Sequence, residues 1–140
     1  MIKKIVLISC ASKKLAYKSK AEDLYISTLF RLSLAFAKKL KLDKIFILSA
    51  KYGLLNLNDE IAPYNETLNN KLTSDIKLWA KKVVIELEKL TNLGNDLFIF
   101  FAGKKYRKYI LPHVNNYEIP LKGLRIGEQL KFLKEKIEQG

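Results

Sequence analysis

The sequence predicts an α/β fold, a three-layer sandwich built around a mostly parallel sheet of four strands. Short runs rich in Ile, Val, Leu and Phe alternate along the chain with longer segments of helical periodicity. Such alternation is typical of parallel sheets whose two faces are covered by helices. The 140 residues contain no linker and no repeat, so we expect one domain over residues 1–140.

Four apolar runs are the predicted strands, and each of them ends in a polar loop. They cover residues 5–8, 45–48, 97–101 and 117–119. The loops that follow contain lysines and begin at Ser9, Ser49, Ala102 and Pro120. Because the carboxyl ends of parallel strands lie along one edge of a sheet, where ligands bind, we expect these loops to converge on a single crevice.

Three longer segments have apolar residues at helical spacing. The predicted helices cover about residues 28–41, 75–90 and 125–138. Ser27 is the expected N-cap of the first helix, and Thr73 or Ser74 is the expected N-cap of the second. A shorter helical piece is predicted over residues 104–111, where Pro112 ends it.

The formal net charge of +12 favours an anionic partner, although a lysine-rich proteome would explain the charge equally well. The first 20 residues hold six lysines and no acidic residue. A second basic group follows the third strand, at Lys104, Lys105, Arg107 and Lys108. Nucleic acid is the commonest polyanion that binds such patches, and we expect DNA in preference to RNA.

The composition excludes several classes of protein. No apolar run reaches the roughly 18 residues of a membrane span. The N-terminal apolar run is too short for a signal peptide and lacks a cleavage site, so we expect a cytoplasmic protein without a membrane partner. One cysteine and one histidine exclude a disulfide framework and zinc sites built from these ligands. Neither a P-loop nor a dinucleotide fingerprint occurs, and we expect no cofactor and no metal.

The remaining chemistry is that of carboxylates, hydroxyls, lysines and aromatic rings. The candidate catalytic carboxylates are Glu22, Asp23 and Glu66. Glu22 and Asp23 form an acidic pair within a basic stretch, although a solvated segment leading into a helix explains this pair equally well. Glu66 belongs to residues 56–72, which lack a regular pattern. Long loops in compact domains are usually functional, so this segment is predicted to form a lid or wall of the crevice.

Two further sets of residues are expected to contact nucleic acid. Hydroxyl, amide and ammonium groups at strand ends suit phosphate, and they belong to Ser9, Cys10, Ser12, Lys13, Lys14, Ser49, Lys51, Gly103 and Lys104. Bases are expected to stack on Tyr52, Tyr64 and Tyr106. Two of these residues have a structural alternative: Cys10 as a small apolar residue that closes its strand, and Tyr52 as a cover over the core.

Several motifs together resemble a family of small, uncharacterised prokaryotic domains. They are Ser9-Cys10-Ala11-Ser12-Lys13, Ala21-Glu22-Asp23-Leu24-Tyr25, Ser49-Ala50-Lys51-Tyr52-Gly53-Leu54 and Pro63-Tyr64. More distantly, the chain is similar to the YaaA family of peroxide-stress DNA-binding proteins and to the domain attached to archaeosine synthase. The second resemblance implies a uracil-DNA-glycosylase-like fold and a modified-base setting. The His-Pro-Ser loop and the Gly-x-Asp-Pro-Tyr motif of true uracil glycosylases are missing, so their mechanism is not carried over.

These observations leave three candidate functions. The first, which we favour, is recognition of a nucleobase in nucleic acid, with metal-independent hydrolysis or transfer at its N-glycosidic bond, as in a DNA glycosylase. The second is a non-catalytic, YaaA-like DNA-binding protein. The third is a domain that binds free nucleotides or nucleosides. Whether the protein is an enzyme at all, and its oligomeric state, stay open at this point.

Overall fold

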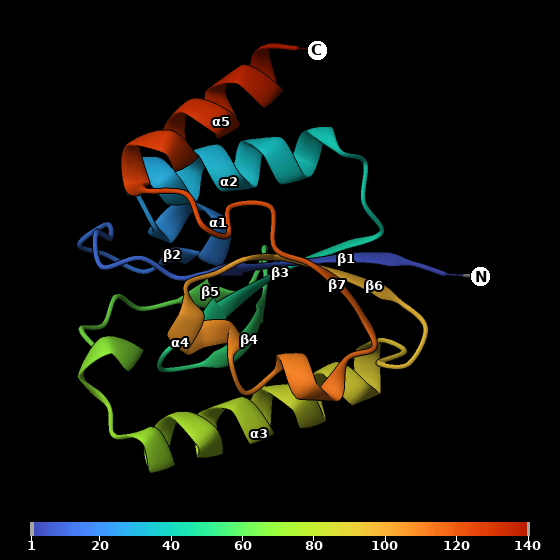
Figure 1. Ribbon diagram of the computed structural model, residues 1–140. Helices are drawn as coiled ribbons and strands as arrows, with labels where there is room; N and C mark the ends of the chain where they lie inside the picture. Colours follow the sequence, from blue (N-terminus) through green and yellow to red (C-terminus); the bar gives the residue numbers. More distant parts are fainter. Residues whose placement is uncertain (1, 140) are drawn as a thin grey trace.

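The computed structural model, which describes residues 2–139, has a central sheet of five strands. Their order across the sheet is β4 (Gly53–Asn56), β3 (Lys44–Ser49), β1 (Lys4–Ser9), β6 (Leu97–Phe101) and β7 (Asn116–Glu118). Helices α2 (Thr28–Lys39) and α5 (Ile126–Glu138) cover one face, and α3 (Thr73–Leu90) covers the other (Figure 1). The predicted α/β class with a mostly parallel sheet is confirmed.

Strand β1 lies at the centre of the sheet and is parallel to both of its neighbours. Leu7 pairs with Phe46 of β3 and with Phe100 of β6. The apolar residues from Ile5 to Ile8 are each at most 1% exposed. A continuous apolar run is needed here because helices cover both faces of the strand. Strand β7 is parallel to β6, so four strands have their carboxyl ends at the same edge.

The prediction of four strands is wrong, because β4 is a fifth strand that runs antiparallel to β3. Its residues were expected to belong to a loop. Ser49 pairs with Gly53, so the chain reverses within residues 50–52. Gly53 has a φ of +76°, a conformation that residues with a Cβ rarely adopt. A strand this short and this close to its neighbour leaves no periodicity of its own in the sequence.

The two long helices that flank the sheet begin differently from each other. Ser27 caps α2 as predicted, since its Oγ accepts a hydrogen bond of 3.2 Å from the N–H of Phe30. The predicted cap of α3 is wrong. Thr73 is already the first helical residue, and Leu72 occupies the cap position without a side-chain hydrogen bond.

The short helix predicted over residues 104–111 is divided in two. Helix α4 covers Lys104–Arg107, and a separate 3₁₀ turn covers Leu111–His113. Pro112 therefore lies inside the second turn rather than after the helix. Proline tolerates this place because the first residues of a helical turn have no intrahelical partner for their N–H.

Residues 56–72 form a packed wall beside the carboxyl edge of the sheet. Strand β5 (Glu60–Ile61) pairs antiparallel with β2 (Ser19–Lys20), which leads into the short helix α1 (Ala21–Leu24). A 3₁₀ turn covers Leu68–Asn70. Tyr64 and Leu68 are only 8% and 1% exposed, so this segment is anchored in the core.

Within residues 2–139, no helix combines the length and the apolar character needed to cross a lipid bilayer.

Replacing Gly53 by alanine is expected to destabilise the protein by about 1–2 kcal/mol, because alanine resists a positive φ. The added Cβ would also lie 2.8 Å from Oε1 of Glu86, although that flexible side chain can move away. Urea unfolding, followed by the fluorescence of the single tryptophan, Trp79, measures the effect.

The matched control is Gly127→Ala. Gly127 lies in the first turn of α5, with open space where a Cβ would be placed. Alanine there should be neutral or stabilising by up to about 1 kcal/mol. Equal loss of stability in both variants, or no loss at Gly53, would contradict the conformational argument.

Candidate functional site

The carboxyl edge of the parallel strands brings together loops that are distant in the sequence. Ser9 of β1 pairs with Leu48 of β3, and Ile8 pairs with Phe101 of β6. The N–H of Cys10 donates a hydrogen bond of 2.9 Å to the carbonyl of Leu48. The segments after β1, β3 and β6 therefore begin side by side, as expected from the topology.

A chain of hydroxyl groups joins β3 to the wall formed by residues 56–72. Ser49 is fully buried, and its Oγ donates a hydrogen bond of 2.8 Å to the hydroxyl of Tyr64. That Oγ also accepts a hydrogen bond of 3.0 Å from the N–H of Tyr52. The hydroxyls of Tyr64 and Tyr25 share a hydrogen bond of 2.6 Å. Ser49 thus uses its hydroxyl to hold the wall in place.

Tyr106 of α4 makes a second set of contacts beneath the same edge. Its hydroxyl lies 3.5 Å from the Sγ of Cys10, which donates to it, and accepts a hydrogen bond of 3.3 Å from the N–H of Leu68. The ring packs edge-to-face on Trp79, with 5.6 Å between centroids. Trp79 in turn donates its indole N–H to the carbonyl of Ser49. These bonds join β1, β3, α3 and α4.

Burial changes the proton affinity of several groups in this region. Desolvation raises the pKa values of Tyr25 and Tyr64 far above their usual range, and it raises the pKa of Tyr106 to about 12. Desolvation lowers the pKa of the Lys14 ammonium, although Cys10 acts in the opposite direction. The Nζ of Lys14 lies 4.4 Å from the centroid of the Tyr64 ring, a cation–π contact.

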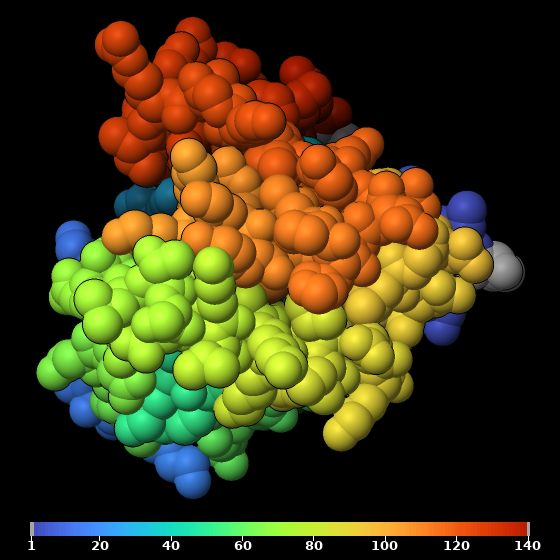
Figure 2. Space-filling view, turned by 60° about the horizontal axis from the view of Figure 1, so that its bottom comes forward, coloured from blue at the N-terminus to red at the C-terminus, as the bar shows by residue number. Residues whose placement is uncertain are grey.

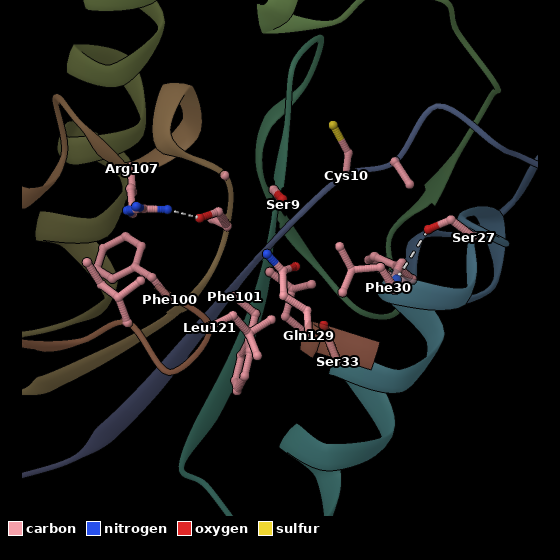
Figure 3. A pocket seen from close by; sticks show the side chains of 16 residues that line it. Ser9, Cys10, Ser27, Phe30, Ser33, Phe100, Phe101, Arg107, Leu121 and Gln129 are labelled. Carbon is pink, nitrogen blue, oxygen red and sulfur yellow. Dashed lines mark hydrogen bonds between the residues drawn. The ribbon is translucent and has the colours of Figure 1, made fainter. Parts of the chain in front are cut away.

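One cavity, of about 140 Å³, opens between β1, β6, α2 and α5; we call it the Ser33 cavity. Figure 3 shows Ser9, Arg107 and Gln129 around it, each from a different element. Arg107 donates a hydrogen bond of 2.6 Å to the carbonyl of Ala102, and burial lowers the pKa of its guanidinium. The cavity walls are otherwise largely apolar, with Leu29, Phe30, Phe100, Phe101, Ile119 and Leu121 among them.

A second cavity, of about 330 Å³, lies on the other side of the loop that follows β1; we call it the Glu66 cavity. It shares Cys10 and Ala11 with the Ser33 cavity. Its lining is rich in polar groups, from Ser12, Lys14, Asn65, Glu66, Thr67, Asn69 and Asn70. A single turn of chain at Cys10 therefore contacts an apolar cavity on one side and a polar cavity on the other.

The three predicted catalytic carboxylates have different surroundings. Glu22 forms an ion pair of 2.8 Å with Lys38 and lines neither cavity. Asp23 is exposed and also lies outside both cavities. Glu66 lines the cavity named after it, and its Oε2 is 4.0 Å from the Nζ of Lys71. The structure therefore separates Glu66 from the other two.

The residues predicted to bind phosphate also divide. Ser9, Cys10, Ser12, Lys14 and Gly103 line one or both of the two cavities. Ser49 is buried and bonded within the protein, whereas Lys13 and Lys51 are exposed outside the cavities. Lys104 lines a third cavity on the α3 side, described below.

The three tyrosines predicted to stack on bases differ in exposure. Tyr64 and Tyr106 are each 8% exposed, and their rings pack edge-to-face on Tyr52 and Trp79. Tyr52 is only partly buried. A base would therefore meet the ring of Tyr52 with less rearrangement than the other two.

Sequence reasoning did not single out several residues that line these cavities. Ser33, Gln129 and the amides of Asn65 and Asn69 belong to this group. Asn65 and Asn69 belong to the predicted wall, residues 56–72, but their amides have no motif of their own. Ser33 and Gln129 resemble ordinary helix residues in the sequence, and only tertiary packing brings them to the site. The sequence marks Arg107 only as part of a basic group, although its place one residue after Tyr106 in a short helix is a usable signal.

Within the described residues, no group of three or more His, Cys, Asp or Glu side chains is placed to hold a metal ion.

Stability is expected to fall above about pH 10, where tyrosines of the unfolded chain lose their protons. In the folded protein, burial keeps Tyr25, Tyr64 and Tyr106 protonated at higher pH. The native state then binds more protons than the unfolded state, so the free energy of unfolding decreases as the pH rises. The linkage slope is up to about 1.4 kcal/mol per pH unit for each such tyrosine. Urea unfolding across this alkaline range measures it.

The Tyr64→Phe variant tests the same argument. It should lose about 1–3 kcal/mol at neutral pH, because Ser49 and Tyr25 lose their hydroxyl partner. It should also have a shallower alkaline slope than the parent protein. Tyr17→Phe is the control at neutral pH, since Tyr17 is 64% exposed and should change stability little. An alkaline slope that Tyr64→Phe leaves unchanged is the outcome that contradicts this account.

Comparison with known proteins gives one match. A family model described as a family of unknown function (DUF6884) matches residues 5–135. A search of curated proteins and a search of solved structures each found no match. The matched segment includes all of the central sheet except Lys4, and most of α5. The chain therefore belongs to this family of unknown function (DUF6884).

Proposed function

We propose that the protein recognises a nucleobase within a nucleic acid and acts on its N-glycosidic bond, with Glu66 as the essential carboxylate. The observation that carries this proposal is the composition of the Glu66 cavity. It combines a carboxylate, the Lys14 ammonium and several amide side chains at the carboxyl edge of a parallel sheet. Ligands bind at this edge in open α/β sheets. We infer DNA in preference to RNA, in the cytoplasm.

The polar lining of the Glu66 cavity suits the edge of a base. Asn65, Asn69 and Asn70 each offer two donors and an acceptor, and Thr67 offers a hydroxyl. Asparagine is a common partner of adenine, and amides in general pair with the polar edges of bases. Enzymes that act on a base draw it out of the stack into a cavity and read it by hydrogen bonds. The volume of about 330 Å³ leaves room for a base and for water.

The chemistry requires a carboxylate and a water molecule. As the bond between C1′ and the base nitrogen breaks, its electron pair leaves with the base, and positive charge develops on the sugar. The Glu66 carboxylate would stabilise this charge or accept a proton from the attacking water, whose oxygen forms the new bond to C1′. The departing base takes up one proton, from Glu66 or from solvent, so that one water molecule is consumed in all. Lys14 would attract the neighbouring phosphate, because phosphate contacts position a nucleic acid on a protein.

The resemblance to the domain of archaeosine synthase supports the same proposal. It implies a uracil-DNA-glycosylase-like arrangement, and a mostly parallel sheet with helices on both faces is compatible with it. Fold likeness alone does not establish a reaction. The proposal therefore depends on the cavity and on Glu66.

A second candidate is a YaaA-like protein that binds DNA without acting on it. One specific observation favours this candidate. Lys71 lies 4.0 Å from the Glu66 carboxylate, and a cation at this distance offsets part of the negative charge that catalysis would use. The net charge of +12 is sufficient for binding by phosphate neutralisation alone.

The Glu66→Gln variant is expected to lose base release while it keeps DNA binding. Glutamine has the shape of glutamate without its charge, so it can neither stabilise the developing positive charge nor accept a proton from water, while the shape of the cavity is kept. The assay incubates single- and double-stranded DNA that contains normal, deaminated, alkylated or 7-deaza bases, and then cleaves abasic sites with alkali. We expect a rate loss of at least about 100-fold, the usual scale for removing an acid or base from a catalytic site.

Glu22→Gln is the matched control, because Glu22 pairs with Lys38 and lies outside both cavities. It should retain the parent rate. If the parent protein releases no base from any of these substrates, the catalytic proposal is lost. If Glu22→Gln loses base release and Glu66→Gln keeps it, Glu66 is not the essential carboxylate.

Binding alone predicts a different result. The logarithm of the association constant should fall linearly with the logarithm of salt concentration, with a slope of about −0.9 for each neutralised phosphate of duplex DNA. Glu66→Gln should bind DNA as tightly as the parent or more tightly, because a negative charge is removed. Fluorescence anisotropy at several salt concentrations measures both effects. No measurable affinity at low salt would exclude this candidate.

A further inference from the structure

A third cavity, of about 260 Å³, lies between α3 and the segment that follows β6; we call it the Tyr109 cavity. Its lining consists of Thr73, Ile76, Lys104, Lys105, Lys108 and Tyr109. Half of these residues are lysines, and none is acidic. Figure 2 shows this face, where the orange residues of the 104–118 segment lie directly against the green-to-yellow residues of α3 and the turn before it.

The positive charge at this cavity has no counterion within residues 2–139. The ion pairs among these residues involve Lys38, Lys71 and Lys131. None of these three lysines lines the Tyr109 cavity. A further cation, Lys77 of α3, lies 5.5 Å from the centroid of the Tyr109 ring, and Lys108 lies 5.4 Å from it. Asp75 of α3 lies between the lining residues Thr73 and Ile76 in the sequence, but it does not line the cavity itself.

The lysines of this cavity come close together in the sequence and share one concave surface. A surface that only needs solubility spreads its charges and mixes their signs. Here three lysines line one concave surface, and Lys77 of α3 and Lys108 both lie near the Tyr109 ring. This arrangement suits an anion that brings several negative charges, together with a planar group able to contact the ring.

The Tyr109 cavity and the Glu66 cavity are neighbours, and one hydrogen bond links residues of their two linings. Lys105 lines the first cavity, and its Nζ donates a hydrogen bond of 3.0 Å to the carbonyl of Asn69. Asn69 lines the second cavity, as does Tyr106, the residue after Lys105. Lys105 therefore stands at the boundary between a basic cavity and a polar cavity.

We propose that the Tyr109 cavity binds the phosphodiester backbone of a single nucleic-acid strand that continues from the Glu66 cavity. This inference rests on the proposed function, since a base held in the Glu66 cavity would be unpaired. The phosphates that flank that base would then contact Lys105 first, and the next phosphates along the strand would contact Lys104 and Lys108. Binding sites for single strands commonly combine a basic groove with aromatic rings.

The test measures the affinity of a fluorescent oligothymidylate of about 12 nucleotides, long enough for one site of this kind. The variant replaces Lys104, Lys105 and Lys108 by glutamine. The control makes the same change of charge on α5, at Lys131, Lys134 and Lys136, on the opposite side of the sheet (Figure 1). A single variant, Lys108→Glu, keeps α4 intact in case the triple variant does not fold.

The cavity variant should bind about tenfold more weakly at moderate salt, and its salt slope should decrease by about 2, which is about 0.7 for each of three lost phosphate contacts to a single strand. Lys108→Glu should weaken binding in the same direction, and the α5 control should change it little. The mononucleotide dTMP should compete poorly, because one phosphate cannot replace several.

Equal losses in the cavity variant and in the α5 control would overturn the inference, because they would indicate binding by net charge alone. Full competition by dTMP would also overturn it, since the cavity would then hold a free nucleotide. If the triple variant and Lys108→Glu bind the strand normally while Glu66→Gln still abolishes base release, this inference is wrong but the proposed function stands. It fails together with the proposed function if the parent protein binds no strand even at low salt.

Discussion

The parallel pairing of β1 with both β3 and β6 is the constraint on which the candidate site depends. It fixes Ser9 beside Leu48, and it brings the segment after β6 to the same edge. Because β1 is buried on both faces, a shift of register would carry Lys4 or Ser9 into the core and disrupt its ladder on two sides. The loops that meet at Cys10 are consequently held by the deeply buried centre of the sheet, even though they come from distant parts of the chain.

Hydroxyl groups extend this rigidity to the wall of the site. The chain from Ser49 through Tyr64 to Tyr25 and the contacts of Tyr106 replace what would otherwise be a flexible loop. Buried hydroxyls that are fully paired give a unique arrangement, whereas unpaired ones would be costly. No buried side-chain nitrogen or oxygen atom within the described residues lacks a partner. Hydrogen bonds thus hold this region in one arrangement before any ligand binds.

The sequence was informative where structure follows from local pattern and uninformative where it follows from tertiary contact. Continuous apolar runs identified the parallel strands, and their direction placed Ser9, Ser49 and Gly103 at one edge. Strand β4 was not predicted, because four residues after a tight reversal of the chain show no periodic pattern. The pairing of Glu22 with Lys38, which removes Glu22 from the cavities, joins residues of different elements that no local motif connects. Charge and residue type suggested an anionic ligand, but only packing could divide the lysines among separate surfaces.

The two outer strands of the sheet also determine how molecules of this protein behave toward one another. Strand β4 has four residues. Strand β7 has three, which are all exposed and include Glu118. An unpaired strand edge can recruit strands from other molecules, and long apolar edges do so most readily. Here the strands with strong aggregation potential, β1, β3 and β6, lie inside the sheet, while its borders are too short to template fibril growth. The strands with the most continuous apolar sequence are therefore kept away from the two edges of the sheet, where pairing with other molecules would begin.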